Sequence, residues 1–286
     1  MKLDPLVARL LSAPVRGYLR TAPIERGKYR LMTWAGRRFL VAPTVFGSWM
    51  RVSGVAEFEW SMALNSSEKE PATERALKRH VAEGAVVLDV GANVGYFTLL
   101  AAYLAGPGGR VHAFEPTPRT AGRLSENVAL NQLRTVEVIE AAASDQPGSA
   151  WLTVEEDSEG NWLEPSGDAQ RGVRVPTITL DGWADERGLA RVDVVKMDCE
   201  GWEPNVLRGA RRLLERSGLP PLIVEINATA LQRAGHSAGS IIDQLTSLGY
   251  ALWQLDRVLW RGAPSVNVLA LPPSIDAGGA PSFRGL

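Results

Sequence analysis

The sequence predicts an α/β fold: a Rossmann-like sheet of seven strands, mostly parallel with an antiparallel last strand, behind an N-terminal extension of helix and β-hairpin. Three observations support this prediction. An apolar run at 86–88 leads through Asp89 into a glycine loop and then into a second apolar stretch, which is typical of a strand, a tight turn and a helix. From Val86 onward strand-like and helix-like segments alternate, as in a parallel sheet covered on both faces. Only residues 257–265 separate the last two strands, which is too short for a crossover helix, so these strands must pair antiparallel.

The individual elements follow from apolar runs and their flanking turn residues. Seven strands are predicted at 86–90, 110–114, 136–140, 192–197, 222–226, 250–255 and 266–271. Helices are predicted near 96–105, 117–130, 181–187, 203–216 and 237–248. Between residues 148 and 180 the alternation breaks, and strand-like runs at 150–154 and 173–175 flank a polar segment. We expect an inserted hairpin there, with residues 155–171 as its mobile tip.

The chain is expected to divide into an N-terminal extension (1–70), a catalytic domain (71–272) and a flexible tail (273–286). Strand-like runs at 29–34 and 37–41 predict a hairpin in the extension, which could act as a substrate lid. Five apolar side chains fall on one face of a helix over residues 3–12: Leu3, Leu6, Val7, Leu10 and Leu11. That face could dock on the domain, on a partner or on a membrane surface. Because only Lys2 and Arg9 add positive charge within the segment, docking on protein is favoured.

Composition limits the classes of partner. The 286 residues are 45% apolar, enough for one full core, and the net charge is −1 with no basic stripe, which disfavours a nucleic-acid partner. The single cysteine excludes an internal disulfide and fits a reducing, cytoplasmic compartment. No apolar run approaches the ~20 residues of a spanning helix, so no stable membrane insertion is expected. A homodimer is compatible with this organisation.

The loop after the first strand identifies the ligand class. It has the form D-x-G-x-N-x-G, in which Gly91, Asn93 and Gly95 follow Asp89. A dinucleotide-binding loop would show G-x-G-x-x-G and a P-loop would continue with G-K-[ST], and neither pattern is present. The form resembles the first motif of class I S-adenosylmethionine-dependent methyltransferases. The resemblance implies that Asp89 or nearby carbonyls hold the ammonium of the cofactor and that the loop amides hold its carboxylate.

Two neighbouring features extend this cofactor site. The helix start, with Phe97 and Thr98, has unpaired amides that attract polar or anionic groups. The second strand ends at Glu115 and Pro116, and Glu115 lies 20 residues beyond Gly95, the interval at which nucleoside-binding units place a carboxylate. A carboxylate can accept hydrogen bonds from both ribose hydroxyls at once.

Longer segments resemble the FkbM family of methyltransferases over roughly residues 71–255. The matching segments are VLDVGANVGYFTLLAA, VHAFEPTP, NVALN at 127–131, TITLDGWA at 177–184 and, most specifically, VVKMDCEGWEPNVLRGA at 194–210. The resemblance implies S-adenosylmethionine as cofactor and methylation of a hydroxyl on a sugar, glycolipid or secondary metabolite. It does not select the acceptor.

The segment at 194–210 carries the candidate catalytic residues. Asp198 and Glu200 follow a strand that should lie beside strand 86–90, at the edge where ligands bind in such sheets. An alcohol must lose a proton as it is methylated, which a carboxylate, a histidine or a metal can assist. We predict that Asp198 is the general base, or holds the base, and also contributes to the cofactor site. Glu200 is its partner or, like Glu203, a helix cap.

Further side chains complete the prediction. His236 lies in a Gly- and Ser-rich loop facing the same edge and is a second candidate base, which the family resemblance does not support. Asp145 lies where class I methyltransferases bind adenine and could accept from its amine, or it could open the turn Asp-Gln-Pro-Gly. Asp198, Glu200 and Glu225 could hold a hard divalent cation, although such acids are also ordinary solvated groups, and we expect no metal.

The predicted function is therefore an S-adenosylmethionine-dependent O-methyltransferase acting on a small-molecule or carbohydrate acceptor. Two alternatives stay open: a non-catalytic scaffold that binds the cofactor, and a methyltransferase for another acceptor class, such as an amine or a macromolecule. Nucleic-acid amino-methyltransferases resemble one another in a [DNS]-P-P-[YF] motif at this strand end. Here Asp198-Cys199-Glu200-Gly201 replaces it.

Overall fold

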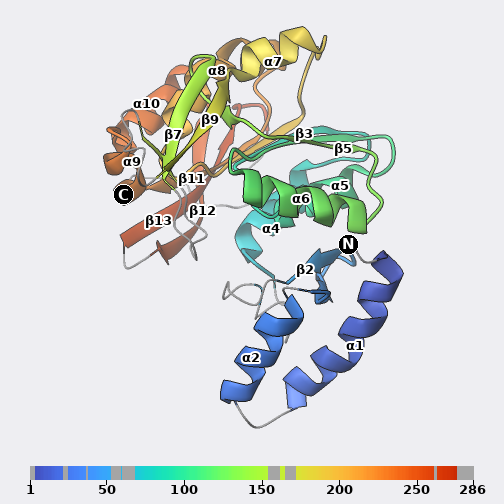
Figure 1. The fold of residues 1–286 in the computed structure, drawn as a ribbon. Helices are drawn as coiled ribbons and strands as arrows, with labels where there is room; N and C mark the ends of the chain where they lie inside the picture. Colours follow the sequence, from blue (N-terminus) through green and yellow to red (C-terminus); the bar gives the residue numbers. More distant parts are fainter. Residues whose placement is uncertain are drawn as a thin grey trace.

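The computed structural model describes residues 4–21, 25–36, 38–52, 59, 68–153, 162–164, 172–260 and 263–275. A seven-stranded sheet forms the centre of the molecule (Figure 1), in the order β12-β13-β11-β10-β3-β4-β5. Its strands are β3 (Val86–Val90), β4 (Arg110–Phe114), β5 (Val136–Ile139), β10 (Val194–Met197), β11 (Leu222–Asn227), β12 (Ala251–Trp260) and β13 (Ala263–Leu271). All seven predicted strands are present, with ends that differ by a few residues.

The strand directions confirm the predicted class I methyltransferase arrangement. β3 pairs in parallel with β4 and β10, and β10 pairs in parallel with β11. β13 runs antiparallel to both β11 and β12. The chain fills the sheet outward from β3 in one direction and then from β10 in the other. The carboxyl ends of β3 and β10 therefore lie at the switch point, where α/β sheets bind ligands.

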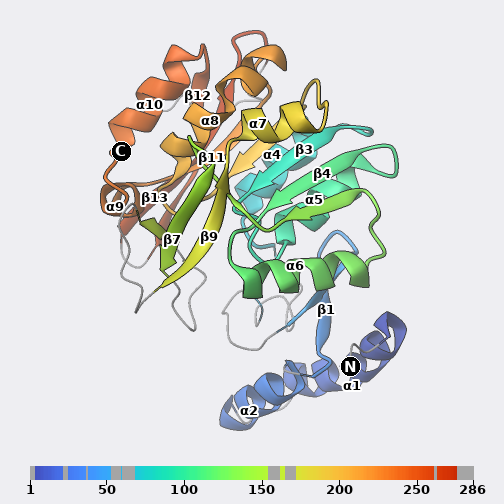
Figure 2. The same ribbon diagram turned by 45° about the horizontal axis from the view of Figure 1, so that its top comes forward.

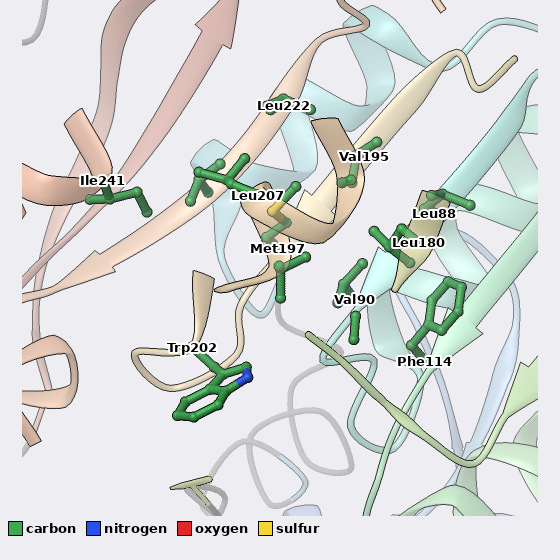
Figure 3. Close-up of a cluster of buried hydrophobic side chains, with 14 of the residues drawn as sticks. Leu88, Val90, Phe114, Leu180, Val195, Met197, Trp202, Leu207, Leu222 and Ile241 are labelled. Carbon is green, nitrogen blue, oxygen red and sulfur yellow. The ribbon is translucent and has the colours of Figure 1, made fainter. Parts of the chain in front are cut away.

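Helices cover both faces of this sheet (Figure 2). On one face lie α4 (Pro71–His80), α5 (Tyr96–Ala105) and α6 (Pro118–Leu130), and on the other α7 (Leu180–Glu186), α8 (Glu203–Arg216) and α10 (Ala238–Ser247). The alternation of side chains along each strand supplies both cores. Leu88, Val90 and Met197 pack beside α8 (Figure 3), whereas Val87, Val194 and Ile223 pack on the α4–α5 side.

The predicted inserted hairpin is confirmed as part of a second, four-stranded sheet. β7 (Gly148–Thr153) pairs antiparallel with β9 (Gly172–Ile178), and β9 pairs in parallel with β6 (Ala142–Ala143). The sequence missed β8 (Trp162–Glu164), which pairs antiparallel with β7 inside the predicted tip. The remainder of that tip lies outside the described residues.

The structure corrects the prediction for the N-terminal extension. Residues predicted as a hairpin at 29–41 largely form helix α2 (Glu25–Gly36), in which Met32 and Ala35 are both fully buried. Their i, i+3 spacing places them on one helix face, and this periodicity prevails over the short alternation that suggested strands. The hairpin lies later in the chain, where β1 (Val41–Pro43) pairs with β2 (Trp49–Arg51).

Helix α1 (Pro5–Thr21) packs on the rest of the chain through a different face from the predicted one. Ala8, Ser12 and Leu19 are buried, while Leu6 and Leu10 are 63% and 66% exposed. In the described part of residues 3–12, the apolar face therefore does not pack on the chain's own domain. A partner and a membrane surface stay open. In the described part of the chain, no helix combines the length and apolar character needed to cross a bilayer.

Two smaller points complete the fold. A short helix, α9 (Ala228–Arg233), was not predicted, and the Asn227 side chain caps it by accepting from the amide of Ala230 at 3.1 Å. Residues 276–286 of the predicted tail lie outside the described residues. The division of the chain at residues 70 and 272 stays a prediction.

Candidate active site

A cavity lies at the carboxyl ends of β3, β4, β10 and β11, at the switch point of the sheet. Its wall includes these predicted site residues: Gly91, Asn93, Gly95, Phe97, Glu115, Pro116, Asp198, Glu200 and Glu225. Four others are not part of that wall: Asp89, Thr98, Asp145 and His236. The structure therefore brings together the glycine loop, Glu115 and the segment that carries Asp198.

The glycine loop is shaped by the chain itself. Gly91 has φ +77°, and a Cβ placed on it would come within 1.8 Å of the carbonyl oxygen of Asp198. Gly95 has φ +95°, and its Cβ would come within 2.3 Å of Leu124 Cδ1. Only glycine satisfies both the left-handed backbone and these close approaches. The first glycine thus lets the cofactor loop lie directly on the segment that carries Asp198.

Glu115 fixes the other side of the same loop. One carboxylate oxygen accepts from the amide of Asn93 at 3.0 Å, and the other accepts from the amide of Thr117 at 2.9 Å. Burial raises the pKa of Glu115, although these amide hydrogen bonds oppose that effect. Each carboxylate oxygen retains a second lone pair, so the group can still accept from ligand hydroxyls.

Asp89 lies behind the cavity wall. Its carboxylate accepts from Thr98 Oγ1 at 2.6 Å, and its other oxygen, buried without a hydrogen bond, lies 3.9 Å from Lys196 Nζ. Burial raises the pKa of Asp89, and Lys196 partly offsets that shift. Asp89 and Thr98 thus tie β3 to α5 and hold Lys196, and their direct contact with a cofactor stays a prediction.

Asp198 and Lys196 form an ion pair on the cavity wall, in which Lys196 is buried and Asp198 is partly exposed. Lys196 Nζ lies 3.3 Å from Asp198 Oδ2 and 5.0 Å from the centre of the Phe97 ring, and Lys196 is only 4% exposed. Burial opposes ionisation of both groups, but their mutual attraction prevails. The pKa of Asp198 is lowered and that of Lys196 is raised. Asp198 is therefore ionised at neutral pH.

Two further carboxyl groups surround this pair. Burial, and then the charges of Asp198 and Glu200, raise the pKa of Glu225 well above its ordinary value, and Glu225 accepts from Ser265 Oγ at 2.8 Å. In its protonated form Glu225 donates to Asp198. Burial likewise raises the pKa of Glu70, which accepts from Thr73 Oγ1 at 3.0 Å. This part of the cavity wall thus places the ionised carboxylate of Asp198 beside Glu70 and Glu225, whose carboxyl groups retain protons more readily.

Glu203 anchors the turn that follows Asp198. It is 1% exposed, and its Oε1 accepts from the amides of Cys199 at 2.7 Å and Gly201 at 3.4 Å. These bonds hold the turn before α8, whereas the N-cap residue of α8, Trp202, makes no side-chain cap hydrogen bond. Glu200, with φ +53°, faces the cavity between these two amides.

The titration of Glu203 gives a testable pH dependence. Burial raises its pKa to about 7, so the folded chain keeps a proton that the unfolded chain loses near pH 4.5. Relative to Glu203→Gln, the wild type should lose stability as pH rises from 4.5 to 7, by on the order of 3 kcal/mol. Urea unfolding of both chains across this range measures the difference. A gap that stays constant with pH would contradict the shift.

His236 and Asp145 lie together in a separate polar group. His236 Nε2 lies 3.0 Å from Asn205 Oδ1, and burial lowers the pKa of His236, with Arg208 adding to that effect. Asp145 accepts from the Arg208 guanidinium at 3.3 Å and from Ser144 Oγ at 3.1 Å. Because neither residue lines the cavity, this group is best explained as structural.

Asp198, Glu200 and Glu225 are the acids that the sequence offers as ligands of a divalent cation. In the segments that the structure describes, no three His, Cys, Asp or Glu side chains are placed to hold a metal ion. Asp198 instead faces the ammonium group of Lys196. The chain thus supplies a cation of its own at this position.

The family follows from comparison with known proteins. A model of the methyltransferase FkbM domain matches residues 89–252, which is more than half of the chain and includes the glycine loop, Glu115 and Asp198. The chain belongs to the FkbM methyltransferase family.

Three relatives illustrate the range of this FkbM family. The chain is 30% identical to the 2-O-methyltransferase NoeI of Sinorhizobium fredii (strain NBRC 101917 / NGR234) over 46% of this chain and 60% of the relative. It is 30% identical to the 31-O-demethyl-FK506 methyltransferase FkbM of Streptomyces tacrolimicus over 49% and 66%. It is 30% identical to the hexuronic acid methyltransferase AglP of Haloferax volcanii over 54% and 61%. The chain therefore spans less than two thirds of the length of these relatives.

Sequence reasoning missed part of this FkbM-family site. Glu70, Lys69 and Asn267 line the cavity, and Asn267 Nδ2 lies 3.3 Å from Glu70 Oε2. None of them belongs to a motif after a parallel strand: Glu70 precedes α4, and Asn267 lies in antiparallel β13. Asn267 lies opposite Glu225 in the register of β11 and β13, and this register is known only from the structure.

The NVALN segment of α6 also receives a structural role. Asn127 donates to the carbonyl of Val94 in the glycine loop at 2.8 Å and accepts from the amide of Arg51 at 2.8 Å. Asn131 accepts from the amide of Trp49 at 2.7 Å and donates to its carbonyl at 2.7 Å. Both side chains therefore connect β2 of the extension to α6, and Asn127 also reaches the cofactor loop.

His236 provides a direct test of the site boundary. Replacing His236 with Gln should leave turnover within about threefold of wild type, because general bases contribute 10²–10⁴-fold and His236 is not on the cavity wall. The pH profile of turnover should also stay unchanged. Steady-state rates at several pH values measure both quantities, and a hundredfold loss would restore His236 as a candidate base.

Proposed function

We propose that the chain is an S-adenosylmethionine-dependent O-methyltransferase for a hydroxyl of a sugar, glycolipid or other small molecule. One observation carries the proposal: an ionised carboxylate, Asp198, lies on the wall of a cavity whose other side is the glycine loop and Glu115. The names of NoeI and FkbM specify methylation of oxygen, and that of AglP specifies a sugar acid. These names support, for this chain, a hydroxyl acceptor.

The residues present fit the cofactor. The backbone of Gly91 and Gly95 leaves the loop without side chains at two positions, so a ligand can lie close to its amides. Glu115 has lone pairs for vicinal ribose hydroxyls. The ring of Phe97 and the ionised carboxylate of Asp198 present a face suited to a cationic group. When bound, S-adenosylmethionine supplies an activated methyl group on a sulfonium centre.

The remaining task of the chain is to align the acceptor and to take its proton. Asp198 receives the proton that the acceptor oxygen loses on methylation. Lys196 and protonated Glu225 hold the Asp198 carboxylate in place through charge and hydrogen bonding. Alignment of the acceptor with the cofactor in the cavity contributes a further ~7–11 kcal/mol in favourable cases. The cavity wall from β7 and β8, with Leu152 and Leu163, is apolar and suits the body of an organic acceptor.

The experiment is transfer of an isotope-labelled methyl group. The chain is incubated with methyl-labelled S-adenosylmethionine and a cell extract, and labelled products are identified by mass spectrometry. We expect a labelled methyl ether on a small molecule or glycolipid. Cofactor binding in calorimetry without any labelled product would favour the scaffold alternative. Label on an amine or a macromolecule would favour a different acceptor class.

A further inference from the structure

Helix α1 presents an apolar stripe that the fold does not use. Leu6, Leu10 and Leu11 are 63%, 66% and 45% exposed, and Val7 and Tyr18 are also exposed. These positions fall on one side of the helix, with a spacing of three, four or seven residues along it. Single exposed leucines are ordinary, but a contiguous stripe along a helix of about 26 Å marks an interaction surface.

The opposite face of α1 already holds the helix on the chain. Ser12 Oγ accepts from the amide of Val41 at 2.9 Å, and Arg16 donates to the carbonyl of Val41 at 2.5 Å. Arg9 donates to the carbonyl of Leu130 at 3.0 Å and stacks over Trp49. The leucine stripe is therefore directed away from the domain on a helix that is itself anchored.

Helix α2 lies next to α1 (Figures 1 and 2), and its sequence includes aromatic and basic residues. Trp34 is 48% exposed, and the Arg38 guanidinium lies 4.8 Å from the centre of its ring. Arg30 and Arg38 are exposed. Tryptophan, leucine and arginine together are the side chains that interfacial membrane helices use.

Charge is concentrated in this part of the chain. Residues 1–40 contain nine basic and two acidic residues, a net charge of +7, whereas the other 246 residues contain 22 basic and 30 acidic residues, a net charge of −8. Only two of these nine basic residues, Lys2 and Arg9, lie before residue 13. With α2 included, residues 1–40 have enough positive charge to bind a surface of anionic lipid headgroups.

We propose that helices α1 and α2 bind the surface of an anionic membrane, with the stripe of Leu6, Leu10 and Leu11 buried among the headgroups and acyl chains. The binding is peripheral and needs no spanning helix. A second copy of the chain is a poor occupant of the same face, because two copies of the segment 1–40, each with a net charge of +7, would repel each other. The anionic lipid surface matches both the apolar stripe and the charge.

Vesicle co-sedimentation of the full chain tests this directly. Vesicles of phosphatidylcholine and phosphatidylserine in a two-to-one ratio should bind the chain, and pure phosphatidylcholine vesicles should bind it far less. Leu6→Ser/Leu10→Ser should weaken binding to the mixed vesicles at least about tenfold, because each leucine loses most of its apolar burial. Arg30→Gln/Arg38→Gln should weaken binding only to the mixed vesicles, and added salt should do the same.

Matched controls distinguish binding through this surface from nonspecific binding of the chain to vesicles. Val173→Ser removes an apolar side chain of 39% exposure on β9, and Arg191→Gln/Arg211→Gln removes two exposed arginines outside the extension. Both controls should bind vesicles as wild type does. Equal binding by all variants, or no binding to the mixed vesicles, would overturn the proposal. Self-association in size-exclusion chromatography that Leu6→Ser/Leu10→Ser abolishes, without vesicle binding, would assign the stripe to a second copy instead.

Discussion

Replacing Asp198 with Asn is expected to lower turnover by about 10²–10⁴-fold, the usual contribution of a general base. Asn keeps the shape of the side chain but cannot take the acceptor proton. Cofactor affinity should fall far less than turnover, because the glycine loop and Glu115 are untouched and only the charge that Asp198 presents to the cationic cofactor is lost. Methyl-transfer rates on the acceptor identified by labelling, together with calorimetry of cofactor binding, measure the two effects separately.

The matched control for this variant is Asp145→Asn. It makes the same chemical change at an acid that pairs with Arg208 and does not line the cavity, so turnover and cofactor affinity should both persist. Thermal melting of Asp198→Asn is also needed, since Lys196 then keeps only Asp89 as an acidic partner within 4 Å among the ion pairs described. Full turnover in a folded Asp198→Asn chain would remove Asp198 from the mechanism. Weaker cofactor binding in Asp145→Asn would support its predicted contact with adenine.

Gly91→Ala should abolish detectable cofactor binding and destabilise the chain by about 3 kcal/mol. A left-handed backbone costs an L-residue ~1–2 kcal/mol, and the added methyl would overlap the Asp198 carbonyl, which lies 1.8 Å from the new Cβ position. The loop or the Asp198 segment must move, and either movement opens the cofactor site. Calorimetry and urea unfolding measure the loss of binding and of stability.

Gly122→Ala is the control for that substitution. Gly122 lies within α6, and a Cβ there would meet no atom within 4 Å. Alanine should therefore stabilise the helix by ~0.5–1 kcal/mol and leave cofactor binding intact. If Gly91→Ala bound the cofactor as tightly as Gly122→Ala, the close packing of the loop on Asp198 would be irrelevant to binding.

The sequence predicted the domain from residue 86 to 216 well because each element there has a strong local signal. Strand β3, the glycine loop and α5 form one continuous pattern, and α8 begins with Glu203 and Pro204 soon after a strand end. The parallel sheet follows from the alternation, and the antiparallel β13 follows from the short connection before it. These features depend on residues close together in the chain.

Features that depend on distant residues were missed or misassigned. Helix α2 was predicted as a hairpin because its burial against the domain, through Met32 and Ala35, is a tertiary effect. Glu70 was missed because its place on the cavity wall, beside Asn267 at a distance of 197 residues along the chain, depends on tertiary structure. Asp89 and His236 were predicted near the ligand from their positions at strand ends and loops. Their side chains contact Thr98 and Asn205 and are not on the cavity wall, and their roles stay predictions.

The most direct test of the proposed cofactor site is a crystal structure of the chain with S-adenosylhomocysteine. We expect the nucleoside above the glycine loop, its ribose hydroxyls within hydrogen-bond distance of Glu115, and its sulfur facing the side of the cavity that carries Asp198. Density for the ligand elsewhere, or a cavity closed by side chains in crystals grown with saturating ligand, would contradict it.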